Sequence, residues 1–476
     1  MLLLKLLFVW TLNNDLKETS SFSLKMVSRP PKKKSSPKQA PAKIQCPAKP
    51  PSSLGEAIQY AETVEELLGI ASRLWLPTDP NLAPHLKTQL VHHQKRQRWS
   101  SQLLLKLSAT FTSKDNFSWE DDRLARAVLA AALPFANVDR PSHEGRYLSQ
   151  ALWALQALSG KTTTTTKTSV HPDICKALRI MMERVEGMAQ QVPLSEAVEM
   201  RWAARGILAR IGQSRIISTA DGADMPLVLE NALPNLDLRV SALPFDIVPL
   251  GVQWNSLDFK DAASSLHDAI PFSFDTIVTR SGSRVTERRG TAWVAEEGIG
   301  SLAYSGKLMP PRPIPNVVRD TMRLVETNIL HDTVPRPSFD CALCNHYPDG
   351  ESACKFHTDP EHGTLWERLT CVVAAGNERR FAFRPIPGSS TWSKWDNVQG
   401  TNVEETLPAV IHLFPGDVVK MWGTCNDDFH HAVYAAEGEN VGHRISLVFK
   451  QAINRGGKRG HGFQGEGRRS RRKHVE

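Results

Sequence analysis

The sequence contains no apolar run long enough to cross a membrane. Hydrophobic residues make up 41% of its 476 residues and charged residues 23%, a balance typical of globular chains rather than disordered or membrane-spanning ones. The most apolar stretch, residues 1–12 (MLLLKLLFVWTL), resembles the core of a signal peptide. It is shorter than the roughly 20 residues that a bilayer requires, and no clear small-residue cleavage site follows it. We therefore expect no membrane contact, and whether this segment is a targeting signal stays open.

Cysteine is scarce. Seven cysteines spread unevenly over the chain do not form the dense pattern of a secreted disulfide scaffold and fit a reducing compartment. Cys341 and Cys344 form a C-x-x-C pair, but no second such pair follows, as a structural zinc site would need. The surrounding FDCALCNHY is typical of a strand, in which positions three apart face opposite sides. We interpret these thiols as buried strand residues rather than zinc ligands.

Basic residues gather near the two ends of the chain. The formal net charge is +8, with lysines following Pro30 and Pro31 and a Gly- and Arg-rich stretch at residues 454–476. We expect residues 1–53 and 454–476 to be disordered, because such compositions cannot bury an apolar face. The basic tail would attract polyanions such as nucleic acid, or would merely keep the chain soluble. These clusters favour the nucleus, with the mitochondrion, plastid or cytoplasm as alternatives.

Residues 54–215 show helical periodicity throughout. Segments such as VEELLGIASRLW and RLARAVLAAAL place apolar residues at three- and four-residue spacing. An Arg-aromatic pattern recurs at Arg98, Arg146 and Arg201, with another expected helix between successive copies. This predicts helix pairs stacked as a short helical repeat, whose concave surface could bind a protein or RNA. Alternatively, the pattern only repeats the packing of the core. Residues 216–240 offer turn residues without periodicity and are expected to be a linker.

Residues 241–453 have a different texture. Short β-rich runs bounded by Gly, Pro and Asp follow one helix-like segment, VVRDTMRLVETNI; they are CVVAA, RFAFRPI, AVIHLF, DVVKMW, HAVYAA and RISLVFK. Their lengths predict an antiparallel barrel of two sheets, a double-stranded β-helix of the jelly-roll or cupin type. The predicted fold class is therefore α+β, with an all-α helical-repeat domain before this β domain.

Three residues of the β-rich half form a possible metal site. His357 and Asp359 are two positions apart, so on a strand both point to the same side. A distant histidine in the sequence Phe-His-His-Ala-Val, either His430 or His431, would complete the set. Two imidazoles and one carboxylate on one face of an octahedron leave three positions open, as in non-haem iron(II) oxygenases.

Residues around this set favour an anionic ligand. Arg444 begins the apolar segment RISLVFK, and a buried guanidinium is costly unless it meets an anion such as a carboxylate. Asn345 and Tyr347 place an amide and a phenol upstream of the His-x-Asp sequence.

From about residue 284 to residue 452 the sequence resembles the AlkB-like dioxygenases. The shared segments are RRGTAWVAEEGIGSLAYSG, CNHYPDG, HTDPE, LFPGDVVKMWG, HHAV and HRISLVFK. The resemblance implies that His357, Asp359 and His431 hold Fe(II). It also implies that Asn345, Tyr347 and Arg444 bind 2-oxoglutarate as cosubstrate. The implied chemistry converts 2-oxoglutarate and dioxygen to succinate and carbon dioxide, with one oxygen atom hydroxylating a C–H bond of the substrate. A hydroxylated N-methyl group then leaves as formaldehyde.

The sequence departs from the family at its last strand. The family pattern is usually R-x-N-x-T-x-R, whereas this chain has Ser446, Val448 and Lys450 in place of the asparagine, threonine and second arginine. Lys450 keeps the positive charge and is expected to contact the cosubstrate, although an ammonium group lacks the planar two-point fork of a guanidinium.

Two residues suggest a nucleobase as substrate. Glu361 extends the metal sequence to H-x-D-x-E, where relatives acting on nucleic acid place an acid that hydrogen-bonds the flipped base. Trp293 lies in the segment that corresponds to the family's substrate lid, where it could stack a base against His357. Alternatively, these residues are a solvated loop glutamate and a core tryptophan.

The sequence thus predicts an oxidative demethylase of N-alkylated bases in methylated DNA or RNA, with a helical-repeat domain that recruits substrate or a protein or RNA partner. A protein side-chain hydroxylase or demethylase of the same fold stays open. So does a catalytically silent RNA-binding protein, for which the departures at Ser446, Val448 and Lys450 are the support.

Overall fold

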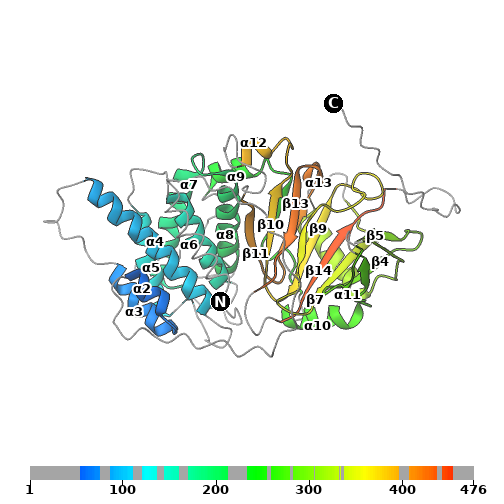
Figure 1. The fold of residues 1–476 in the computed structure, drawn as a ribbon, viewed down its shortest axis with the longest axis horizontal. Coiled ribbons are helices and arrows are strands. Elements are labelled where there is room, and N and C mark those ends of the chain that lie inside the picture. Colours follow the sequence, from blue (N-terminus) through cyan, green and yellow to red (C-terminus); the bar gives the residue numbers. More distant parts are fainter. Residues whose placement is uncertain are drawn as a thin grey trace.

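The computed structural model describes most of both predicted halves (Figure 1). The described residues are 54–74, 86–110, 119, 121–136, 144–159, 170–212, 233–254, 259–278, 282–304, 306–331, 333, 337–395, 407–436 and 442–453. The predictions of disorder for 1–53 and 454–476 lie outside them. Among the described residues, no helix combines the length and the apolar composition needed to cross a bilayer.

The first half is helical, as predicted. Its helices are α2 (Leu54–Tyr60), α3 (Val64–Leu74), α4 (Leu86–Thr110), α5 (Asp122–Ala132), α6 (Glu144–Ser159), α7 (Pro172–Met188), α8 (Leu194–Gly212) and α9 (Pro234–Val240), with a short 3-10 turn at Leu133–Phe135. Helix α6 packs between α4 and α8, and α5 packs against α7. The helices therefore lie in two layers, and α8 is the one next to the strands (Figure 1).

Local sequence explains where these helices begin. The carboxylate of Asp121 accepts hydrogen bonds from the backbone amides of Arg123 and Leu124 and so caps α5. Pro172 occupies the first turn of α7, where its missing amide proton costs nothing.

The last part of the expected linker, residues 216–240, is a helix in the structure. Residues 216–232 lie outside the described residues, but Pro234–Val240 form helix α9 rather than irregular linker. Leu236 and Val240 are buried, and Glu186 of α7 accepts a hydrogen bond from the backbone amide of Asn235 at 2.7 Å. The prediction missed this helix because Leu236, Leu238 and Val240 alternate with polar residues and so do not show helical spacing. Packing against α7 and α8 decides the conformation.

The second half contains two antiparallel sheets. The larger has the strand order β1-β12-β9-β14-β7-β4 and the smaller has the order β11-β10-β13-β8. The larger consists of β1 (Phe245–Val248), β4 (Gly290–Ala295), β7 (Cys341–Tyr347), β9 (Thr370–Gly376), β12 (Val418–Met421) and β14 (Arg444–Lys450). The smaller consists of β8 (Cys354–His357), β10 (Arg379–Pro385), β11 (Ala409–Leu413) and β13 (Phe429–Val433). Helices and antiparallel sheets are thus combined, as expected for an α+β chain.

Short elements complete this half. Two small hairpins pair β2 (Thr276–Val278) with β3 (Arg284–Thr286) and β5 (Leu302–Tyr304) with β6 (Lys307–Met309). The remaining helices are α10 (Phe259–Ala269), α11 (Asn316–Asn328), α12 (Trp392–Trp395) and α13 (Cys425–Asp428).

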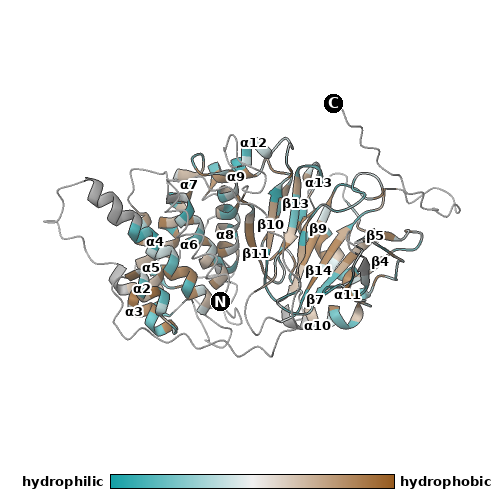
Figure 2. Cartoon of the chain, in the orientation of Figure 1, coloured by the Kyte–Doolittle hydropathy of each residue, from teal (hydrophilic) through white to brown (hydrophobic). Residues whose placement is uncertain are grey.

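Strand β14 divides its side chains between two environments. Ile445, Leu447 and Phe449 join an apolar core with residues of α10 and α11, which cover the outer face of the six-stranded sheet. Arg444, Ser446, Val448 and Lys450 alternate with them and face the four-stranded sheet. Figure 2 shows hydrophobic colours along β9 and β14 in the middle of the large sheet. The polar groups of β14 are therefore held between two sheets, out of bulk water.

Helix α8 joins the helical half to the sheets through buried charges. The guanidinium of Arg210 donates to the carboxylate of Asp417 at 2.7 Å, with the two side chains 6% and 1% exposed. Asp417 also accepts hydrogen bonds from the backbone amides of Leu250 and Phe414. Because every oxygen of this carboxylate has partners from both halves, the ion pair ties them into one structure.

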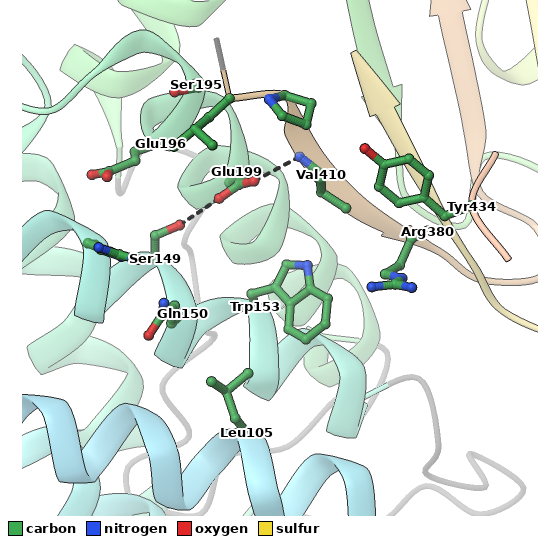
Figure 3. A pocket seen from close by; sticks show the side chains of 13 residues that line it. Leu105, Ser149, Gln150, Trp153, Ser195, Glu196, Glu199, Arg380, Val410 and Tyr434 are labelled. Carbon is green, nitrogen blue, oxygen red and sulfur yellow. Dashed lines mark hydrogen bonds between the residues drawn. The ribbon is translucent and has the colours of Figure 1, made fainter. Parts of the chain in front are cut away.

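A pocket of about 280 Å³ lies at the same interface, between α4, α6 and α8 and the small sheet. Figure 3 shows Glu199 of α8 reaching between Ser149 and Val410, which donate to its carboxylate at 3.1 and 2.8 Å. Trp153 and Tyr434 contribute aromatic walls.

Replacing Arg210 by Met should lower the free energy of unfolding by about 3–5 kcal/mol, because it leaves the buried carboxylate of Asp417 without its cation. Arg205→Met is the control, since Arg205 is 41% exposed and lies 3.3 Å from Asp246; we expect a loss below about 1 kcal/mol. Urea denaturation would measure both, and equal losses would contradict the role of the buried pair.

Candidate metal centre

Three side chains from neighbouring strands converge on one point. His357 is the last residue of β8 and lies opposite His431 of β13 in the antiparallel register. Asp359 follows two residues later, with its Oδ1 3.7 Å from His357 Nε2 and 3.6 Å from His431 Nε2. One potential ligand atom from each residue lies within 4.8 Å of the others. The structure therefore brings together the three residues that the sequence indicated.

The register also separates the two adjacent histidines. His431 pairs with Phe383 of β10 and is buried, whereas His430 pairs with Arg384 and projects to the opposite side of the sheet. His430 is not part of the converging group. Of the two alternatives left open by the sequence, only His431 is placed to share an ion with His357 and Asp359.

The carboxylate of Asp359 is kept ionised inside the protein. Burial by itself would raise the pKa of Asp359, but Lys450, His362 and His431 together hold that pKa well below its usual range. Burial also lowers the pKa of His431, so its imidazole is neutral and its lone pair is available. An anionic carboxylate beside a neutral imidazole is the donor set that Fe(II) accepts.

Lys450 makes two contacts at the metal centre that the sequence did not predict. Its ammonium group donates to Asp359 Oδ2 at 2.7 Å and is 2.9 Å from His362 Nε2, with only 2% of the residue exposed. Lys450 therefore contacts the carboxylate of the metal centre, and its expected contact with the cosubstrate stays a prediction. A compact ammonium group suits the contact with one oxygen of Asp359, which does not need the two parallel hydrogen bonds of a planar guanidinium.

His362 was missed in the sequence, although it lies only three residues after Asp359. Its ring also contacts the hydroxyl of Thr370 at 3.2 Å and the side-chain amide of Asn426 at 3.1 Å. The side-chain oxygen of Asn426 in turn accepts the backbone amide proton of Asp359. These contacts fix the orientation of the carboxylate from the side away from the histidines.

Two of the residues expected to bind the cosubstrate, Asn345 and Tyr347, line the same pocket from the large sheet. Tyr347 and Asn345 of β7 are paired with Arg444 and Ser446 of β14. A pocket lined by Asn345, Tyr347 and Ser446 is also lined by the three residues of the candidate metal centre. The two sheets thus enclose a space with potential metal ligands on one side and polar groups on the other.

The guanidinium of Arg444 is buried, and two of its three nitrogens have no hydrogen-bond partner among the described residues. The residue is 0% exposed, its Nε donates to Ser446 Oγ at 3.3 Å, and neither Nη1 nor Nη2 has a hydrogen-bond partner among the described residues. Burial lowers the pKa of Arg444 to about 10, which leaves it cationic at neutral pH. The buried Oδ1 of Asn345 also lacks a partner there. Since unpaired buried charges are costly, these groups fit an anionic ligand such as a dicarboxylate.

Arg289 is a second pocket residue that was missed in the sequence. It precedes β4, is 6% exposed and lines the pocket with Tyr304, whose ring centre lies 5.3 Å from its guanidinium carbon. Its Nε and Nη1 have no hydrogen-bond partner in the described part of the chain, and its Nη2 is 3.6 Å from Glu287. The sequence RRG offered no signal for this role, because inward orientation depends on the pairing of β4 with β7.

The two residues expected to contact a base do not line this pocket. Trp293 is a core residue of β4, 1% exposed; its Nε1 donates to Gly300 O at 3.0 Å and its ring lies 5.1 Å from Trp366. Of the two alternatives that the sequence left open, the structure fits a core tryptophan. Glu361 is exposed in a turn with a φ of 59°, and its carboxylate accepts the hydroxyl proton of Thr364.

This pocket and its metal-binding triad define a class of non-haem iron oxygenases. A family model of the 2OG-Fe(II) oxygenase superfamily matches residues 259–450. An uncharacterized protein, R406, of Acanthamoeba polyphaga mimivirus is 32% identical over 174 residues, which are 37% of this chain and 78% of the viral protein. Residues 259–450 thus form a domain of the 2OG-Fe(II) oxygenase superfamily, whose cofactor is Fe(II) and whose cosubstrate is 2-oxoglutarate.

Asp359→Ala should abolish Fe(II) binding, because it removes the only carboxylate of the converging triad. His430→Ala should retain both iron and 2-oxoglutarate turnover, since His430 projects away from the triad. Iron content after anaerobic loading and succinate formation would measure the two effects. The opposite pair of phenotypes would show that the neighbouring histidine is the ligand.

Arg444→Leu should raise the KM for 2-oxoglutarate by tenfold or more, because charge-assisted hydrogen bonds are worth about 1.5–3 kcal/mol. Val448→Leu, which alters an apolar pocket wall on the same strand, is the matched control and should change that KM less. Succinate formation at varied 2-oxoglutarate would show the difference. An unchanged KM in Arg444→Leu would rule out this arginine as the anchor.

Proposed function

We propose that this chain is an AlkB-like oxygenase that removes alkyl groups from the nitrogen atoms of nucleobases in DNA or RNA. The observation that supports this proposal is the single pocket between the two sheets. It is lined by the triad of two histidines and one aspartate and by Tyr347. Tyr347 pairs with Arg444, a buried arginine whose Nη atoms have no partner among the described residues.

In this proposal His357, Asp359 and His431 hold Fe(II) and leave its remaining positions open. Arg444, with Tyr347 beside it, binds the distal carboxylate of 2-oxoglutarate, and Asn345 orients the oxoacid end. Iron with 2-oxoglutarate and dioxygen would supply the oxidation that hydroxylates an N-alkyl group, which then departs as an aldehyde and leaves the free base.

The protein's own residues keep this site in order. Lys450 and His362 hold Asp359 as an anion in a fixed orientation, so that the carboxylate needs no rearrangement when a cation arrives. The apolar side chains of Val372, Phe381 and Val433 line the pocket and limit access of water.

A cluster of cations and rings on the face of the small sheet away from the metal centre supports a nucleic acid as substrate, bound beyond the pocket itself. The guanidinium of Arg384 lies 4.3 Å from the ring centre of Phe356, and that of Arg380 lies 5.6 Å from the ring centre of Tyr434. The two rings are 6.0 Å apart. Arginines that attract phosphate beside rings that stack on bases are typical of single-strand binding surfaces. The H-x-D-x-E sequence with Glu361 points to the same substrate class.

The helical half has a separate role in this proposal. Helices α4, α6 and α8 hold the three copies of the Arg-aromatic pattern and pack in succession. We propose that they form a short helical repeat that recruits a protein or RNA partner.

The decisive experiment incubates the full chain with Fe(II), 2-oxoglutarate and a panel of methylated DNA and RNA oligonucleotides, with methylated peptides in parallel. We expect formaldehyde and the unmodified nucleoside from an oligonucleotide, and neither from Asp359→Ala. Product from the peptides alone would contradict a nucleic acid as substrate and would indicate a protein instead. Absence of succinate and formaldehyde with every substrate would contradict the proposed activity.

Glu361→Ala should alter the preference among methylated bases more than it alters succinate formation, because Glu361 lies outside the pocket lining. Thr364→Ala is the control, because it removes the hydroxyl that donates to Glu361 but leaves the glutamate in place. It shows the effect of disturbing the turn alone. Mass spectrometry of nucleosides would measure the preference. An unchanged preference in Glu361→Ala would contradict a role in reading the base.

A further inference from the structure

Three histidines meet on the outer face of the large sheet, away from the candidate metal centre. They are His267 in the last turn of α10, His346 on β7 and His443 directly before β14. The ring centres are 4.7 Å apart for His267 and His346, 5.7 Å for His267 and His443, and 5.5 Å for His346 and His443. Helix and sheet thus place three imidazoles around one point.

His346 is the buried member of this cluster. It is 5% exposed, and neither ring nitrogen has a hydrogen-bond partner among the described residues. The rings of Phe272 and Phe274, with centres 5.2 and 6.1 Å away, provide no polar partner. A buried polar group without a hydrogen-bond partner lowers the stability of the fold by about 1–3 kcal/mol. A ligand that accepts the lone pair of an imidazole nitrogen would remove this penalty.

The charge state of the cluster suits a metal ion. Burial, together with the neighbouring imidazoles of His267 and His443, lowers the pKa of His346 to about 4. Burial likewise lowers the pKa of His443, followed by the effect of His267, while Asp268 acts in the opposite direction. His346 and His443 are therefore neutral at physiological pH, the form in which imidazole binds zinc.

The spacing of the rings agrees with a shared ion. A zinc–nitrogen bond is about 2.0–2.1 Å, which puts each ring centre about 3 Å from the ion and two rings about 5 Å apart at a tetrahedral angle. The three measured separations lie around this value. In the described side-chain orientations the nitrogens do not all point inward. His267, whose side chain is 47% exposed, can turn about its Cβ–Cγ bond, a torsion with a broad energy minimum.

We propose that His267, His346 and His443 form a second metal site that binds Zn²⁺, with a water molecule as the fourth ligand. The site fastens α10 to β7 and to the start of β14. His346 lies between Asn345 and Tyr347 in the chain, and His443 precedes Arg444. A zinc ion on the outer face of the large sheet therefore restricts the motion of β7 and β14. The opposite face of these strands carries Asn345, Tyr347 and Arg444.

The test measures zinc bound per chain by mass spectrometry after an untagged full-length protein is equilibrated with Zn²⁺ and dialysed. The variant His267→Gln/His443→Gln changes partly exposed residues only and should bind one zinc ion fewer than the unchanged protein. His331→Gln, at an exposed histidine outside the cluster, is the matched control and should lose none.

This difference does not depend on the proposed oxygenase activity, because zinc held by the iron ligands contributes equally to both proteins. Thermal unfolding gives a second measurement: Zn²⁺ should raise the Tm of the unchanged protein more than that of the double variant. Equal zinc content in the two proteins would overturn the proposal and leave His346 as a buried ring without a ligand.

Discussion

The structure of the pocket depends on one buried carboxylate and the cation that holds it. Asp359 lies between His357 and His431 on one side and Lys450 on the other, with the lysine 2.7 Å away. A carboxylate enclosed by protein would normally take up a proton, and Lys450 prevents this. Because Lys450 ends β14 and Asp359 follows β8, this contact also joins the large sheet to the small one.

Strand alternation extends this arrangement across the pocket. On β14 the apolar residues face α10 and α11, and the residues between them face the small sheet. The same alternation on β7 puts Asn345 and Tyr347 in the pocket and His346 behind it. Strands β7 and β14 therefore carry the polar pocket residues on one face and contribute to the histidine cluster on the other. A ligand bound at the cluster would thus restrain the strands that hold the pocket residues.

The sequence predicted much of this site because its spacing is local. His357 and Asp359 are two positions apart on extended chain, and their sides follow from that spacing. The segments around Val372, Ile411 and Leu447 are short and β-rich, and each forms a strand as predicted. In the helical half, periodicity was sufficient for α5 and α7, whereas the seven-residue α9 needed its neighbours to be stable.

What the sequence alone determined is therefore the class of the chain, its two halves and the residue types of the metal centre, because these depend on composition, periodicity and short spacing. The family resemblance already implied His431 rather than His430, and the structure agrees with it. Only the tertiary structure decided that Lys450 binds Asp359 and that Trp293 is a core residue. The physical reason is that such choices depend on strand register. A shift of one residue exchanges the two faces of a strand, and register is set by contacts between residues that are far apart in the chain.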